Sequence, residues 1–226
     1  GAHYTTKGST SSRICMHPDP QAVPSGWDIS ASADIYGVEW EQGLHIDHDA
    51  ACAVCQRADA GHTYVQWGRS DSCSNGHTTL YTGTAMTEAD SHYRTEMVCV
   101  DRTREGHSTN NPASADGALW YAVEMHGGGS GASDQAQYPD STDIGCSVCG
   151  TAAASGAVYV QYGATSCSSG SETLYSGFVA GAHYTTKGST SSRICMHPDP
   201  QAVPSGWDIG ASADIYGVEW EQGLHI

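Results

Sequence analysis

Nine cysteines are the residues of this chain whose types and spacing carry the clearest chemistry. Eight of them form two sets with one order: a CxxC pair, a third cysteine 18 residues later, and a fourth after a further 26 or 28 residues. The first set is Cys52, Cys55, Cys73 and Cys99, and the second is Cys146, Cys149, Cys167 and Cys195. The ninth, Cys15, lies in the same local sequence as Cys195.

Four cysteines in one set suit either a zinc site or two disulfides. Zinc sites of this kind usually take two ligands from each of two CxxC-like turns. Here the third and fourth cysteines stand singly on separate strand-like segments, which favours disulfides. We expect each set to close its own two bridges, from the CxxC pair to the third and fourth cysteines, with the choice of partners left open. We expect Cys15 to pair with a cysteine of a neighbouring copy.

A second group with possible chemistry is the run HIDHD just before the first CxxC, which contains His45, Asp47, His48 and Asp49. On an extended strand residues 45, 47 and 49 point to one side. Imidazole and carboxylate groups together bind metals, so this run predicts a site for Ca²⁺ or another metal. The alternative is a polar strand that packs against the disulfides, because the second set has no histidine at the matching place. No other cofactor is indicated.

Catalytic motifs are missing from the sequence. It contains no G-x-S-x-G and no H-E-x-x-H. Serine and histidine are plentiful, yet no spacing places a base beside a nucleophile and an orienting acid. We therefore expect a protein that is not an enzyme.

Two levels of repetition organise these residues. Residues 1–46 and 181–226 are identical except that Ser30 is replaced by Gly210, which indicates a recent tandem duplication with a period of 180 residues. We expect the chain to begin and end inside a repeat unit. A weaker repeat relates the two cysteine sets, so that each 180-residue unit consists of two homologous halves. Its matching segments are YVQWG and YVQYG (64–68, 159–163), LYTG and LYSG (80–83, 174–177), and ALWYAVEM and DIYGVEW (118–125, 214–220).

Composition and alternation predict the fold class. The chain has one Phe, a hydrophobic content of 38% and 27 Gly, so a large aliphatic core is excluded. Alternating β-branched and aromatic residues predict strands at 35–40, 64–67, 119–123 and 159–162. We expect an all-β protein of tandem, small antiparallel domains stapled by disulfides, each bridge contributing about 3–4 kcal/mol. The predicted units are 1–46 (back part of a preceding half), 47–125 (first domain), 126–143 (Gly/Ser-rich linker) and 144–226 (second domain).

Several of these segments together resemble a known family. GLHIDHDAACAVC (43–55), YVQWG…C (64–73), LYTG, SHYRTEMVCVD (91–101) and GALWYAVE (117–124) are similar to the cysteine-rich non-collagenous domain of sponge short-chain, spongin-like collagens and related secreted proteins of aquatic invertebrates. The resemblance covers nearly the whole chain outside 126–143. It implies a matrix or secreted setting and offers no catalytic residues. The chain has no Gly-X-Y triplets, so it is not itself a collagen.

The net charge of the chain excludes two classes of binding partner. The net charge of −16 repels phosphate backbones and anionic lipid, so nucleic acid and membrane surfaces are excluded as partners. High cysteine use indicates an extracellular, secreted protein. Near-identical repeats favour a structural protein that assembles head-to-tail with itself into a filament or matrix fibre. The alternative is a secreted, lectin-like module that binds glycans through exposed Trp and Tyr.

Overall fold

The computed structural model of the 226-residue chain describes residues 5, 11–16, 19, 21, 38–42, 46–48, 50–106, 118–126, 139, 141–152, 156–183, 185–201, 203 and 212–218. Within these ranges the protein is nearly all-β, with one short 3-10 turn at Ser74–Gly76 and no α-helix. The strands are β1 (Val38–Trp40), β2 (Ala60–Trp67), β3 (Thr78–Thr87), β4 (Val98–Asp101), β5 (Ala118–Met125), β6 (Thr142–Asp143), β7 (Gly145–Ala152), β8 (Phe178–Gly181), β9 (Ile194–Met196) and β10 (Ala213–Gly217).

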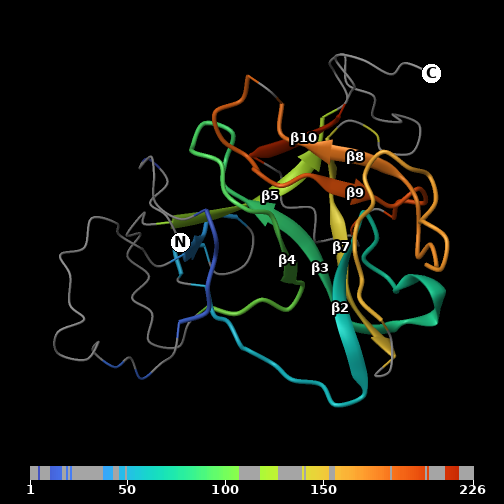
Figure 1. Ribbon diagram of the computed structural model, residues 1–226. Helices are drawn as coiled ribbons and strands as arrows, with labels where there is room; N and C mark the ends of the chain where they lie inside the picture. Colours follow the sequence, from blue (N-terminus) through green and yellow to red (C-terminus); the bar gives the residue numbers. More distant parts are fainter. Residues whose placement is uncertain are drawn as a thin grey trace, which may run out of the picture.

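Seven of these strands form a closed ring (Figure 1). The hydrogen-bonded order is β3–β5–β10–β8–β9–β2–β7, and β7 pairs back with β3. Strand β4 extends the sheet beside β3, while β1 and β6 pair with β5. The ring therefore mixes strands from both predicted halves.

The central strand β5 forms from the sequence ALWYAVEM, whose buried side chains are those of Ala118, Leu119, Ala122, Val123 and Met125. Its Val123 and Met125 are fully buried against Ile144, Met196 and Ile215. Methionine fills irregular gaps, which suits a core with so few leucines and one phenylalanine. This core lies inside the ring and holds the strands of both halves together.

Strand β7 departs most from the sequence-based boundaries. It begins two residues after the predicted linker 126–143, yet it inserts between β2 and β3, which belong to the first predicted domain. It pairs antiparallel with both of them. The cysteines of the second CxxC thus lie in the middle of a sheet built from the first half.

One predicted strand is wrong. Residues 159–162 were expected to form a strand like β2, and they are coil with largely exposed side chains. A strand needs a hydrogen-bonding partner, and no strand of the described residues pairs with this segment. The other predictions are confirmed at β2 and β5, and at β1 for residues 38–40, since 35–37 lie outside the described residues.

Within the described parts of the chain we find no helix of the length and apolarity needed to cross a membrane.

Candidate functional site

Three disulfides are present: Cys15–Cys52, Cys73–Cys149 and Cys99–Cys146. Cys55, Cys167 and Cys195 are free thiols. The expectation that each set closes its own two bridges is therefore wrong, because two bridges join the first set to the second. The expectation that Cys15 pairs with a neighbouring copy is also wrong, because its partner is in the same chain.

The three bridges follow one rule. The fourth cysteine of one set pairs with the first cysteine of the next CxxC, as in Cys99–Cys146 and, from the segment that matches Cys195, in Cys15–Cys52. The third cysteine pairs with the second cysteine of the next CxxC, as in Cys73–Cys149. Under this rule Cys55 would pair with the third cysteine of a preceding set, and Cys167 and Cys195 would pair with the CxxC of a following set. No described segment of the chain contains those partners, and these three cysteines are the free thiols.

The position of β7 explains the pairing. Residues three apart on a strand point to opposite faces, so Cys146 and Cys149 reach different partners across the sheet. Both are fully buried, between β2 on one side and β3 on the other. The first CxxC, by contrast, lies in exposed coil, where Cys52 pairs with Cys15 and Cys55 has no disulfide partner.

The segments around the third cysteines have the same local contacts in both sets. The backbone N–H of Cys73 donates to Thr79 Oγ1 at 3.2 Å, and that of Cys167 donates to Thr173 Oγ1 at 3.1 Å. The next residue in each set, a serine, donates from its backbone and its hydroxyl to a glutamine Oε1. These pairs are Ser74 with Gln66, and Ser168 with Gln161.

The fourth cysteines also have equivalent surroundings. The hydroxyl of Tyr81 donates to the carbonyl of Cys99, and that of Tyr175 donates to the carbonyl of Cys195, both at 3.0 Å. In the strand ladders Cys99 lies opposite Ala85, and Cys195 lies opposite the matching Val179. The second set thus reproduces the local frame of the first.

The two cysteine sets differ in the strands that surround them. In the first set β3 starts at Thr78 and pairs along its first half with β7. In the second set the matching strand β8 starts only at Phe178, and residues 172–177 are coil. Residues 158–162, which match β2, are coil as well. Both segments that would flank a strand like β7 are present, and no described strand lies between them.

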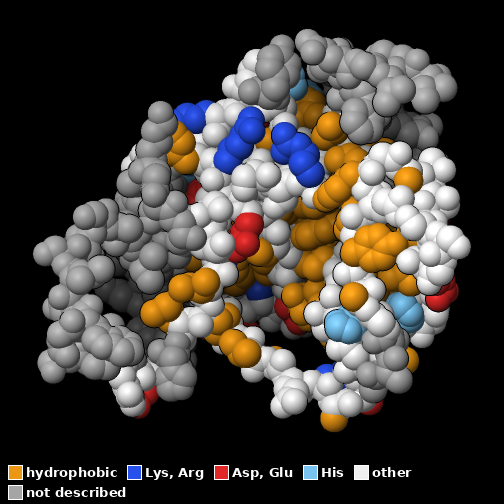
Figure 2. All heavy atoms as spheres, in the orientation of Figure 1, with side chains coloured by type: hydrophobic (Ala, Val, Ile, Leu, Met, Phe, Trp, Pro, Cys, Tyr) orange, Lys and Arg blue, Asp and Glu red, His pale blue; other side chains and the backbone are white. Residues whose placement is uncertain are grey.

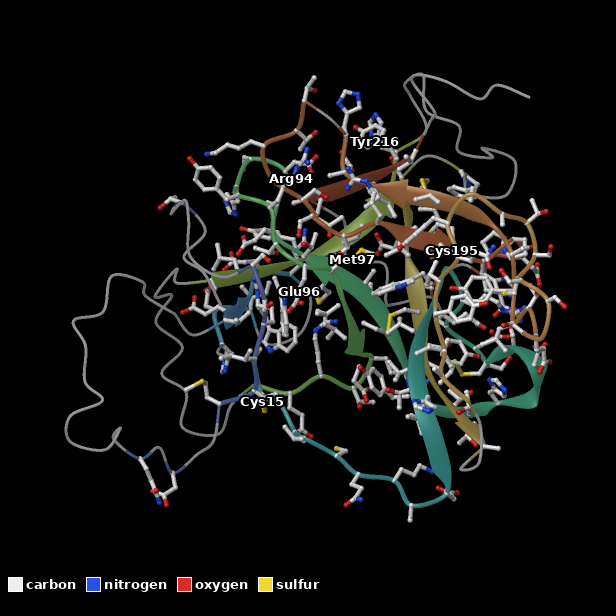
Figure 3. All side chains as sticks on the ribbon, in the orientation of Figure 1. Cys15, Arg94, Glu96, Met97, Cys195 and Tyr216 are labelled. Atoms are coloured by element: carbon white, nitrogen blue, oxygen red, sulfur yellow. A yellow bond between two sulfur atoms is a disulfide. The ribbon has the colours of Figure 1, made fainter. Side chains whose placement is uncertain are left out.

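A cleft of about 490 Å³ occupies this position. Its lining includes Val160, Leu174 and Tyr175 together with two of the three free thiols, Cys167 and Cys195. Figure 2 shows apolar side chains exposed at the right, where the gold and orange coil of residues 156–177 lies in Figure 1, and Figure 3 places Cys195 beside that coil. Tyr159, Val160 and Tyr162 are each 50% or more exposed there. Such an exposed apolar group is characteristic of an interaction site.

Burial changes the chemistry of two groups in the cleft. It raises the pKa of the Tyr175 hydroxyl above its ordinary value, with a smaller contribution from Cys195. It also raises the pKa of the Cys195 thiol, which therefore stays protonated at neutral pH and reacts slowly as a nucleophile.

The HIDHD run is only partly described. His45 and Asp49 lie outside the described residues. Asp47 has φ of 62° and sits in a turn, where its N–H donates to the carbonyl of Trp40 at 2.9 Å. The alternation expected of an extended strand is thus interrupted at Asp47. No group of three metal-binding side chains occurs among the described residues, and the metal site stays a prediction.

Sequence reasoning missed a buried ion pair that positions Cys15. Glu88 is fully buried and accepts from Arg13 Nη2 at 3.0 Å and from the backbone N–H of Leu119 at 2.9 Å. His92 Nδ1 lies 3.0 Å from its other oxygen. Burial lowers the pKa of Arg13, and the charges of Glu88 and Glu96 oppose that shift. The contact fixes the segment 11–16 against the sheet. No spacing in the sequence indicates it.

Comparisons with family models, with curated proteins and with solved structures found no match.

Proposed function

We propose that this protein is an extracellular structural protein, a tandem-repeat subunit of a filament or matrix fibre. The observation that carries the proposal is the disulfide rule: each bridge joins one cysteine set to the CxxC of the following set. A linear array needs covalent or packed contacts between successive units, and such contacts repeat identically when the units are alike.

Three further observations support it. The contacts around Cys73 and Cys167 match in type and distance, as expected of two homologous halves. Three disulfides in the described residues fit an oxidising compartment, and so does the resemblance to the non-collagenous domain of spongin-like collagens. The net charge of −16 keeps soluble subunits apart until a specific contact forms.

Electron microscopy tests this function. Purified protein incubated in a glutathione redox buffer is expected to form filaments whose repeat is set by a 180-residue unit. Discrete particles at every redox ratio and protein concentration would contradict a structural role.

A second candidate is a secreted, lectin-like module. The observation that favours it is the exposure of Tyr159 and Tyr162 at the cleft, since aromatic rings with a polar edge stack on sugars. Binding on a glycan array that is lost in Tyr162→Ala would support this candidate. Absence of glycan binding together with filaments would exclude it.

A further inference from the structure

We propose that the cleft beside Cys167 and Cys195 binds the CAVC segment of a second copy of this chain as an added β-strand. Two intermolecular disulfides hold it, Cys195 to Cys52 and Cys167 to Cys55 of the second copy. This inference rests on the proposed function and names the partner contact from which the filament is built. We call residues 50–56 the donor segment, and residues 158–162 with 172–177 the acceptor segments.

The first cysteine set shows how such a strand sits. In β7 the second cysteine, Cys149, lies opposite Tyr64 of β2 and Thr79 of β3. The first cysteine, Cys146, lies opposite Trp67 and Gly83. Strand addition of this kind gains main-chain hydrogen bonds on both sides of the new strand.

The same register transfers directly to the acceptor segments. Tyr159 and Thr173 match Tyr64 and Thr79, so Cys55 of the second copy would lie between them, next to Cys167. Tyr162 and Gly177 match Trp67 and Gly83, so Cys52 of the second copy would lie next to Cys195. CAVC and CSVC differ at one residue, which fits the same two cysteine positions.

The donor segment is anchored at its start, where Ala50 bridges Gly106 and the N–H of Ala51 donates to the carbonyl of Glu105 at 3.2 Å, and its last residues are exposed coil. Cys55 is a free, exposed thiol, and Val54 is 88% exposed. The matching residue of β7, Val148, is half-buried between Val65 and Tyr81. Residues 51–57 form no strand. Donor and acceptor are therefore complementary parts of one unit, each without its counterpart.

A single copy does not bring the two parts together. Cys52 is bonded to Cys15, which Figure 3 shows at the lower left of the sheet, whereas Cys195 lies toward the right of it. A donor from one copy and an acceptor from another form a head-to-tail contact, which leaves a free donor and a free acceptor at the two ends. Such a contact propagates into a linear polymer.

The two bonds form by different steps. The minor thiolate fraction of Cys195 slowly attacks the Cys52 sulfur of the Cys15–Cys52 disulfide in the second copy; the Cys195–Cys52 bond forms and Cys15 leaves as a thiolate. Cys167 and Cys55 are both thiols, so their bond requires a disulfide oxidant such as oxidised glutathione, which is reduced to two glutathione thiols that carry the two protons.

Residues 181–226 repeat residues 1–46 with one substitution, so Cys195 brings to the donor segment almost the same neighbouring sequence as Cys15. After the exchange the donor segment therefore has neighbours similar in sequence to those around Cys15, and it gains contacts with the acceptor segments as well.

The test uses a synthetic peptide of residues 47–57, DHDAACAVCQR, with the full chain carrying Cys55→Ser in a glutathione redox buffer. We expect one peptide per chain, with mass spectrometry of the unreduced digest showing Cys195–Cys52 and Cys167–Cys55 bonds. Hydrogen exchange at 158–162 and 172–177 is expected to slow at least tenfold. The matched controls are a peptide with both cysteines changed to serine and a chain with Cys167→Ser and Cys195→Ser.

Two results would overturn the proposal: peptide attached in both registers, or peptide attached through one sulfur without slower exchange at the acceptor segments. Each would show reactive thiols without a built strand site. The proposed function fails separately. If the full chain forms filaments without these two bonds, the proposed strand contact is wrong and the structural function stands. If the peptide inserts in one register but the full chain forms only discrete particles, the filament is wrong and the strand contact stands.

Discussion

Asp90 is a carboxyl group whose ionisation is linked to folding stability. It is half-buried, and its Oδ1 accepts from the backbone N–H of Asp214 at 3.2 Å. Burial raises the pKa of Asp90 to about 6; the hydrogen bond from the backbone N–H of Asp214 opposes this shift, the side chain and charge of Asp214 add to it, and nearby His126 lowers it. The folded state therefore binds a proton that the unfolded state has released between about pH 4 and 6, and stability falls as pH rises through this window.

Asp90→Asn is accordingly expected to stabilise the protein at pH 7. Asparagine keeps the acceptor oxygen for Asp214 and removes the buried charge. The gain is about 1 kcal/mol, reduced from the full effect of the pKa shift because the side chain is only half-buried. Urea unfolding at pH 4 and pH 7 measures it. The exposed Asp199→Asn serves as control, with a change below about 0.5 kcal/mol at either pH.

The three free thiols are expected to differ in reactivity. Cys55 is exposed, whereas Cys195 is half-buried and its pKa is raised by burial. Alkylation by iodoacetamide at pH 7.5 should modify Cys55 at least tenfold faster than Cys195, because the thiolate is the reacting form. Peptide mapping over time measures both rates. Equal rates would show that the cleft around Cys195 is more open than the structure has it.

At the scale of elements, two glycines allow neighbouring backbone segments to approach closely. A Cβ added at Gly83 would overlap the carbonyl oxygen of Val100, where β3 pairs with β4. A Cβ added at Gly177 would overlap the carbonyl oxygen of Met196 in the same way. Gly83 is the position at which β3 also pairs with β7 opposite Cys146, so a side chain there disturbs two ladders at once.

We therefore expect Gly83→Ala to cost about 2–3 kcal/mol, the upper part of the usual range for overpacking. Gly156→Ala is the matched control, since a Cβ there meets no atom within 4 Å, and its effect should stay within about 0.5 kcal/mol. Chemical denaturation without reductant measures both. A small effect at Gly83 would mean that β4 shifts freely away from β3.

The same elements show which parts of the fold the sequence could predict. Strands β2 and β5 were predicted because their β-branched and aromatic residues alternate. Residues 159–162 have almost the same sequence as 64–67, yet only the latter form a strand. Local pattern sets the preference for extended backbone, but a strand requires a partner, and the partner of β2 is β7 from a distant part of the chain.

The sequence alone could identify the cysteines of the candidate site, but it could not predict which cysteines pair with each other. Spacing and composition marked the cysteines as disulfide-forming, and the internal repeat gave each one an equivalent. The partners depend on β7 returning to lie between β2 and β3, and its sequence GCSVCGTA has neither strong alternation nor bulky side chains. Its position follows from the closed ring, which is a property of the whole sheet.

At the scale of the molecule, the bridges divide into two kinds. Cys99–Cys146 and Cys73–Cys149 are buried and join β7, a strand of the closed ring, to β4 and to the segment that follows β2. Cys15–Cys52 joins two exposed coil segments outside it. The chain-entropy model gives each bridge about 4 kcal/mol, because the closed loops have 37, 47 and 76 residues and the dependence on loop length is logarithmic.

That value applies to global unfolding only when the bridge lies within the unit that unfolds cooperatively. Replacing Cys99 and Cys146 with serine should therefore lower the free energy of unfolding by about 4 kcal/mol or more, since two buried hydroxyls are added as well. Replacing Cys15 and Cys52 should lower it by less than about 1 kcal/mol, while the ion pair of Arg13 with Glu88 keeps the segment 11–16 in contact with the sheet. Urea unfolding in non-reducing buffer, followed by tryptophan fluorescence, compares the two double variants. Equal losses would show that residues 11–16 and 50–56 unfold together with the ring, and that the donor segment is held too firmly to leave Cys15 for a second copy.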